Sequence, residues 1–296
     1  MYLIYDTETT GLPKNFSAPV SDSENWPRLV QIAWQLHNDM GELIEVKNFI
    51  VRPQDFTIPF NAEKIHGIST KRAQEQGVDL AFVLEEFNKA IAQSTFIVGH
   101  NIVFDINIMG AEFFRAQMHT SLMDEKTIDT KEEGTDFCAI PGGRGGKFKW
   151  PTLTELHTKL FNEGFNEAHN ASADVEATTR CFLELIRLRV INHQRLSFEE
   201  DYNQRFLAEN PKPFELLGLN IEPYTPLGSG FLEQEPEVVA SSAVADDAEL
   251  QDLPFSHLHC HSSYSVLQAS CDVPDLIAKA KEYGMPAVAL TDTGNM

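Results

Sequence analysis

The sequence predicts an α/β fold in which helices cover a mixed sheet, and three observations support that prediction. Short apolar runs of strand composition occupy 2–5, 29–36, 43–51, 96–99 and 127–129. Segments with helical spacing of apolar residues occupy 80–92, 103–117 and 172–191. A turn at 38–41 joins two of the strands as a hairpin, whereas the later strands alternate with helices. This order predicts one sheet with both antiparallel and parallel strands.

Length and composition are those of an ordinary globular protein. The 296 residues allow about two domains, with 42% apolar and 23% charged residues. We expect no membrane contact, because no apolar run of about 18 residues occurs. The N-terminus lacks the features of a signal peptide. The four cysteines show no CxxC spacing, so we expect reduced thiols in a cytoplasmic protein.

The net charge of −21 is unevenly distributed along the chain. Residues 192–253 carry 3 basic against 13 acidic side chains, nearly half of the excess. Such acidity disfavours tight non-specific binding to phosphate backbones. It does not exclude an enzyme that meets nucleic acid through bound cations. Within the acidic stretch, 225–253 has the composition of a flexible linker, and 192–224 is an uncertain helical extension with one candidate helix at 197–208.

Acidic side chains recur at the predicted strand ends and helix starts. Asp6 and Glu8 follow the first apolar run at positions i and i+2, so an extended chain points both to one side. Paired carboxylates of this kind suit Mg²⁺, although solvated acids in a turn are the alternative. Asp105 lies near the start of the helix after the 96–99 strand, where capping is the alternative role.

The last acidic motif combines a histidine and an aspartate. If Ser172 caps the final helix, Asp174 lies in its first turn and His169 on the preceding loop. An imidazole there could take a proton from water while the helix presents Asp174 to a metal. A structural histidine is the alternative.

Together these motifs resemble the DEDD exonuclease superfamily in its histidine-containing branch, an RNase H-like fold. They are similar in particular to the proofreading epsilon subunits of bacterial DNA polymerase III. The matching segments are DTETTGL at 6–12, IHGI at 65–68, VGHNIVFD at 98–105, IDT at 128–130 and HNASADVEAT at 169–178. The resemblance defines an exonuclease domain at 1–191.

The resemblance implies a role for each matching residue. Asp6, Glu8 and Asp174 would hold the metal that carries the attacking water, with Glu8 also taking part in catalysis. Asp6 would bridge to a second metal steadied by Asp105, and His169 would be the general base. The cofactors would be two Mg²⁺ or Mn²⁺ ions.

The same resemblance suggests a pocket for the 3′-terminal nucleotide. Its residues would be Thr7, Thr9, Leu12, His66 and Phe104, with core or loop packing as the alternative for the last three. Asp129 is expected to be structural. A loop with Arg144, Lys147 and Lys149 is the only basic cluster in the sequence, and it contacts DNA phosphates or is simply solvated.

The C-terminal piece, 254–296, predicts a β-α-β unit too short for its own core. His257, His259 and His261 alternate along its first strand, a pattern typical of a transition-metal site. With GMPAVALTDTGNM at 284–296, it resembles the start of the PHP barrel in bacterial DNA polymerase III alpha subunits. That resemblance places His259, His261 and Asp292 in an incomplete second metal site, because Thr293 stands where the family has a histidine.

We therefore expect a metal-dependent 3′–5′ exonuclease that acts on DNA 3′ ends in the bacterial cytoplasm. It would proofread for a polymerase body joined in cis through the acidic linker. One alternative is an RNA exonuclease like oligoribonuclease or RNase T. Another is an inactive module that binds a partner such as a sliding clamp, through 204–207 or the linker.

Overall fold

The computed structural model describes residues 1–164, 171–219, 222–224, 257–260, 273–282 and 288–290. Contacts divide the chain into two units, 1–229 and 230–296. None of the helices within those described ranges is long and apolar enough to cross a membrane.

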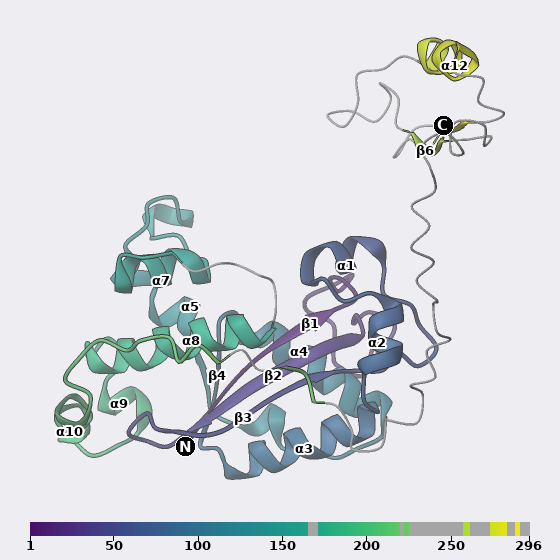
Figure 1. Ribbon diagram of the computed structural model, residues 1–296. Helices are drawn as coiled ribbons and strands as arrows, with labels where there is room; N and C mark the ends of the chain where they lie inside the picture. Colours follow the sequence, from purple (N-terminus) through teal and green to yellow (C-terminus); the bar gives the residue numbers. More distant parts are fainter. Residues whose placement is uncertain (165–170, 220–221, 225–256, 261–272, 283–287, 291–296) are drawn as a thin grey trace, which may run out of the picture. The chain divides into compact units, whose positions relative to one another are not determined.

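The larger unit is built on a five-stranded mixed sheet (Figure 1). The strand order is β3-β2-β1-β4-β5. The first three strands pair antiparallel, and β4 and β5 run parallel to β1. The strands are β1 (Tyr2–Thr9), β2 (Leu29–His37), β3 (Leu43–Ile50), β4 (Phe96–Gly99) and β5 (Thr127–Asp129). The predicted hairpin, parallel strands and mixed sheet are confirmed.

Helices cover both faces of this sheet (Figure 1). One face packs on α3 and α4, and the other on α7 and α8. The helices of this unit are α1 (Phe60–His66), α2 (Thr70–Gln76), α3 (Leu80–Gln93), α4 (Ile102–Arg115), α5 (Thr130–Glu133), α6 (Thr135–Cys138), α7 (Leu153–Phe161), α8 (Ala171–Arg187), α9 (His193–Leu196) and α10 (Tyr202–Glu209), with 3₁₀ turns η1 (Leu122–Asp124) and η2 (Arg144–Gly146).

Two predicted helix boundaries are wrong, and backbone conformation explains both. The helix expected at 172–191 ends at Arg187, because Arg189 adopts a left-handed φ of 61° and the Val190 amide turns back to the Leu185 carbonyl, 2.9 Å away. The helix expected at 197–208 begins only at Tyr202, because Ser197 adopts a left-handed φ of 57° that ends α9.

The extension after α8 packs against the sheet-and-helix core. Tyr202 and Phe206 of α10 are fully buried in the cluster that also holds Tyr2, and the Tyr2 and Tyr202 hydroxyls lie 2.7 Å apart. Farther on, the Tyr224 amide donates to the Asn48 carbonyl at 2.8 Å. Residues 202–219 and 222–224 therefore contribute to the same folded unit as the strands.

In the smaller unit, strands β6 (His257–Cys260) and β7 (Val288–Leu290) pair in parallel, and α12 (Val273–Glu282) lies between them in the sequence. The predicted β-α-β order is confirmed for these described residues. The whole of the predicted linker, 225–253, lies outside them.

Candidate active site

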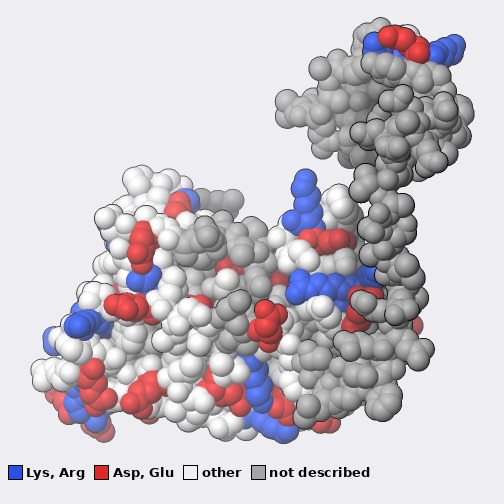
Figure 2. Space-filling model, viewed as in Figure 1, with Lys and Arg blue, Asp and Glu red and all other residues white. Residues whose placement is uncertain are grey.

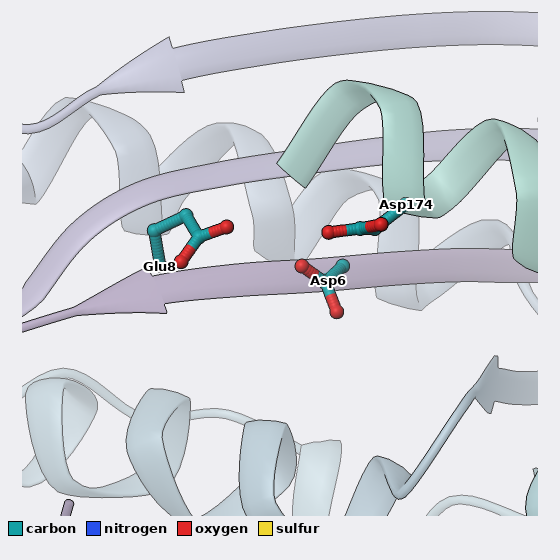
Figure 3. Close-up of side chains that lie close together, drawn as sticks. All are labelled: Asp6, Glu8 and Asp174. Atoms are coloured by element: carbon teal, nitrogen blue, oxygen red, sulfur yellow. The ribbon is translucent and has the colours of Figure 1, made fainter. Parts of the chain in front are cut away.

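Three carboxylates gather beside one end of β1 (Figure 3). Asp6 and Glu8 lie on β1, and Asp174 lies in the first turn of α8. One oxygen of each lies within 4.8 Å of the others. Two residues therefore come from a single strand, and the third comes from a helix far along the sequence.

Strand periodicity explains how β1 presents its two acids. Successive side chains of a strand point to opposite faces, so Asp6 and Glu8 share the face that carries Ile4. Ile4 packs in the same cluster as α8. The first strand is longer than predicted, because pairing with β2 continues beyond the apolar run, with Asp6 opposite Ala33 and Glu8 opposite Gln31. Regular sheet geometry thus holds both acids rigidly.

Repulsion among neighbouring carboxylates raises the pKa values of Asp6 and Glu8. Burial and the charges of Asp105, Asp174 and Glu8 raise the pKa of Asp6 well above its usual range. Burial, with the charges of Asp174 and Asp105, raises the pKa of Glu8 from 4.5 to about 8. No hydrogen bond from the described residues to Asp6 or Glu8 offsets this repulsion. A positive charge placed among these carboxylates would therefore stabilise their ionised forms.

The donor set fits a hard divalent cation. Carboxylate oxygens are the ligands that Mg²⁺, Ca²⁺ and Mn²⁺ prefer, and the spread of up to 4.8 Å between them is compatible with ligands around one ion. A bound cation would also relieve the repulsion that raises the pKa values of Asp6 and Glu8.

Asp105 stands beside the three-carboxylate group but is not a member of it. It is only 4% exposed on the first turn of α4, and its Oδ1 accepts both the Thr7 hydroxyl at 2.6 Å and the Thr7 amide at 3.1 Å. Burial raises the pKa of Asp105 to about 7, and the Thr7 bonds oppose that rise. Both Thr7 bonds end on Oδ1, so Thr7 engages only one of the two carboxylate oxygens.

Thr7 has a role in the site that the sequence did not predict. Its amide and hydroxyl hold Asp105, and its place in the nucleotide pocket stays a prediction. The signal in the sequence was its place between Asp6 and Glu8, because alternation sends the middle residue to the opposite face. What it would meet there could not be deduced from spacing.

Three other pocket residues lie on separate elements. Leu12 is 74% exposed on the loop after β1, and Phe104 on α4 is partly buried against the apolar core. His66 is buried at the end of α1, where its Nδ1 accepts the Ile68 amide at 3.1 Å. Burial lowers the pKa of His66, and contact with the Thr9 backbone opposes that shift, which places the imidazole next to the end of β1.

The remaining predicted residues divide into two groups. Asp129 is structural, as expected, because its Oδ1 accepts the amides of Asn101 and Lys131 at 2.9 Å each. His169, His261 and Asp292 lie outside the described residues, and for His259 only the backbone in β6 is described. Their roles stay predictions.

Comparison with known protein families agrees with this arrangement. Residues 3–182 match the family model described as Exonuclease (RNase T), and residues 257–296 match the model of the PHP domain. The first match covers more than half of the chain and includes all three clustered carboxylates.

Individual relatives fall into two groups. DNA polymerase III PolC-type from Streptococcus thermophilus is 29% identical over 210 residues, which are 71% of this chain and 13% of that protein. DNA polymerase III subunit alpha from Chlamydia trachomatis is 59% identical over 39 residues, which are 13% of this chain and 3% of that protein. The chain thus spans a small part of the length of these curated relatives.

Among solved structures, E. coli Exonuclease I in complex with a dT13 oligonucleotide is similar in fold. The TM-score is 0.51 at 23% identity, over 66% of this chain and 42% of that one. An RNase H-like mixed sheet flanked by helices is thereby confirmed.

Proposed function

This chain belongs to the exonuclease family, and we propose that it hydrolyses DNA from the 3′ end with the help of two divalent cations, Mg²⁺ or Mn²⁺. The observation that carries the proposal is the meeting of Asp6, Glu8 and Asp174 within 4.8 Å. Removal of nucleotides from a primer terminus by such a site would serve proofreading.

Each acid has a task in this proposal. Asp6, Glu8 and Asp174 would hold one cation, and Asp6 with Asp105 would hold the second. Such ions, when bound, lower the pKa of the attacking water and neutralise the leaving 3′ oxygen. His169 would accept the proton of that water. Thr7 would keep Asp105 oriented toward the site through its two hydrogen bonds.

The surface charge is consistent with recognition through cations rather than through a broad basic patch. Lysines, arginines and acids are interspersed on the face shown in Figure 2. Affinity for a phosphate backbone would then come from the metal site and from local contacts.

The substrate and the setting are further parts of the proposal. The PolC-type and alpha-subunit relatives support a DNA primer end as substrate and a polymerase body in cis, in the bacterial cytoplasm. A sliding clamp receives less support, because the candidate segment 204–207 lies in α10, where Phe206 is fully buried.

A cleavage assay tests the proposal. The purified chain is incubated with 5′-labelled single-stranded deoxyribo-oligomers, with and without Mn²⁺. We expect stepwise shortening from the 3′ end, stopped by EDTA and abolished in Asp6→Ala and Asp174→Ala variants that keep their circular dichroism. Absence of shortening, or full activity in both variants, would contradict the site. Faster cleavage of a matched ribo-oligomer would contradict DNA proofreading and support an RNA exonuclease instead.

A further inference from the structure

A large aromatic side chain is exposed on the segment that precedes α7. Trp150 is 60% exposed, whereas Trp26 and Trp34 are buried at 3% and 0%. Phe148, two residues earlier, is 44% exposed. Burial of an indole stabilises a protein strongly, and an exposed indole does not contribute that free energy. Aromatic side chains are enriched on the surfaces where proteins bind partners.

The indole is held in a defined position. The Lys131 ammonium lies 4.4 Å from the centroid of the Trp150 ring and also donates to Asn101 Oδ1 at 2.7 Å. Lys131 is 15% exposed, so this cation is fixed against one face of the ring. The exposure of Trp150 leaves ring surface open to a planar ligand.

The backbone beside Trp150 is attached just beyond the end of β4, the strand next to β1. His100 Nε2 donates to the Pro151 carbonyl at 3.1 Å, and its Nδ1 lies 3.0 Å from the Thr130 hydroxyl. Ile4 of β1 lies opposite Val98 of β4 in parallel register, so His100 lies at the level of Asp6 on the neighbouring strand. Adjacent strands are about 4.8 Å apart.

This segment also lies on the same side of the sheet as the three carboxylates. Leu156 of α7, just after Pro151, packs in one cluster with Ile4 and Val98, on the face covered by α8. The segment that carries Trp150 therefore lies beside the candidate active site, on the sheet face covered by α8. Lys147, exposed in the same segment, adds positive charge to a chain that is strongly acidic overall.

We propose that Trp150, supported by Lys131, stacks on a base of the single-stranded nucleic acid upstream of the 3′-terminal nucleotide. This inference rests on the proposed function, since that function supplies the strand. Stacking on an aromatic ring tolerates any base, and a cation within reach of the backbone favours a phosphate. A proofreading site needs binding of this kind, because it must accept a DNA strand of any sequence.

Tryptophan fluorescence gives a direct test. The chain has three tryptophans, and Trp150 alone among them is exposed, so stacking should quench its emission. We expect quenching of the full chain by a phosphorothioate-linked thymidine octamer, which resists hydrolysis, and little quenching by thymidine 5′-monophosphate. No quenching by the octamer at saturation would overturn the proposal.

Substitutions separate stacking from a structural role. Trp150→Ala should weaken octamer binding, measured by anisotropy of a labelled strand, about tenfold. Trp150→Phe should restore most of it. Phe114→Ala, which removes a 51% exposed ring on α4, is the matched control and should leave binding unchanged. Equal binding by Trp150→Ala and the unmodified chain would contradict the assignment.

Activity on a short substrate completes the test. Thymidine 5′-monophosphate p-nitrophenyl ester occupies only the cleavage site, so Trp150→Ala should keep its kcat/KM while KM for the octadeoxynucleotide rises about tenfold. An equal loss on both substrates would mean that Trp150 only supports the fold. If the unmodified chain cleaves neither substrate but the octamer still quenches Trp150, the proposed function fails and the stacking site stands.

Discussion

The buried acids on the two faces of β1 have different surroundings. On the α8 side, Asp6 and Glu8 face Asp174, and repulsion with burial raises their pKa values. On the other side, Thr7 gives Asp105 two hydrogen bonds, which oppose the rise of its pKa to about 7. The α8 side is thus arranged to receive cations. On the other side two protein donors hold Asp105, which in the proposed function also serves the second cation.

This difference separates function from stability. A site that depends on a ligand for its missing charge is costly to fold without that ligand, whereas hydrogen bonds from protein donors reduce the cost of burying an acid. The α3 and α4 face behind Thr7 is correspondingly apolar, with Tyr5, Trp34 and Phe87 in ring contact. Changes on the two sides should therefore differ in their effects on stability and activity.

The largest expected effect on stability lies on the apolar side. Phe87→Ala should lower the free energy of unfolding by about 3–5 kcal/mol, because it leaves a cavity beside Tyr5 and Trp34. Phe82→Ala, on the same helix but 37% exposed, is the matched control and should cost clearly less. Urea unfolding measures both, and similar losses would contradict a distinct buried core at Phe87.

The next effect, on activity, lies on the α8 side. Asp6→Asn should reduce 3′ cleavage by at least about 100-fold, because it removes a carboxylate shared by the proposed cations. Without metal at pH 8 the same variant should melt at a higher temperature than the unmodified chain, since a repelling charge is gone. Asp124→Asn, an exposed acid on η1, should change neither quantity. Loss of stability without loss of rate would reverse this assignment.

Substitutions of Thr7 should have smaller effects, on both stability and cleavage rate. Thr7→Val removes the 2.6 Å hydroxyl bond to buried Asp105, which should cost about 1–3 kcal/mol of stability and lower the cleavage rate. Thr7→Ser keeps the hydroxyl and should retain most of both. Thermal unfolding and steady-state rates measure the pair. Identical behaviour of the two variants would show that the hydroxyl bond is unimportant.

The last effect concerns the pH dependence of stability. The pKa of Glu8 is about 8 in the folded chain and near 4.5 when unfolded, so between these values the folded state holds a proton that the unfolded state releases. Stability of the metal-free protein should therefore be fully present below pH 4.5 and decline as pH rises toward 8. The slope is at most about 1.4 kcal/mol per pH unit for each such proton.

Calorimetry across this range, in EDTA, checks the expectation. Glu8→Gln should flatten the decline, and Glu85→Gln on the exposed side of α3 should not. Added Mn²⁺ should also flatten it, because a cation replaces the protons. A metal-free midpoint that rises from pH 5 to 8 would contradict the raised pKa of Glu8.

Much of the architecture was predictable because local patterns carry it. The strands at 29–36 and 43–51 and their hairpin follow from β-rich runs around a turn, and alternation alone places Asp6 and Glu8 on one side. Helix ends were less predictable. The left-handed residues Arg189 and Ser197 break helical spacing, and nothing in side-chain periodicity marks them.

The sequence by itself determined which acids the site contains and that two of them share a strand face, because residue type and strand period are local properties. Only the tertiary structure decided that Asp174 meets those two, that Asp105 accepts from Thr7, and that His100 bonds the Pro151 carbonyl next to Trp150. These are contacts between elements distant in the chain. Their geometry depends on how the sheet and the helices pack, which no spacing of residues along the sequence encodes.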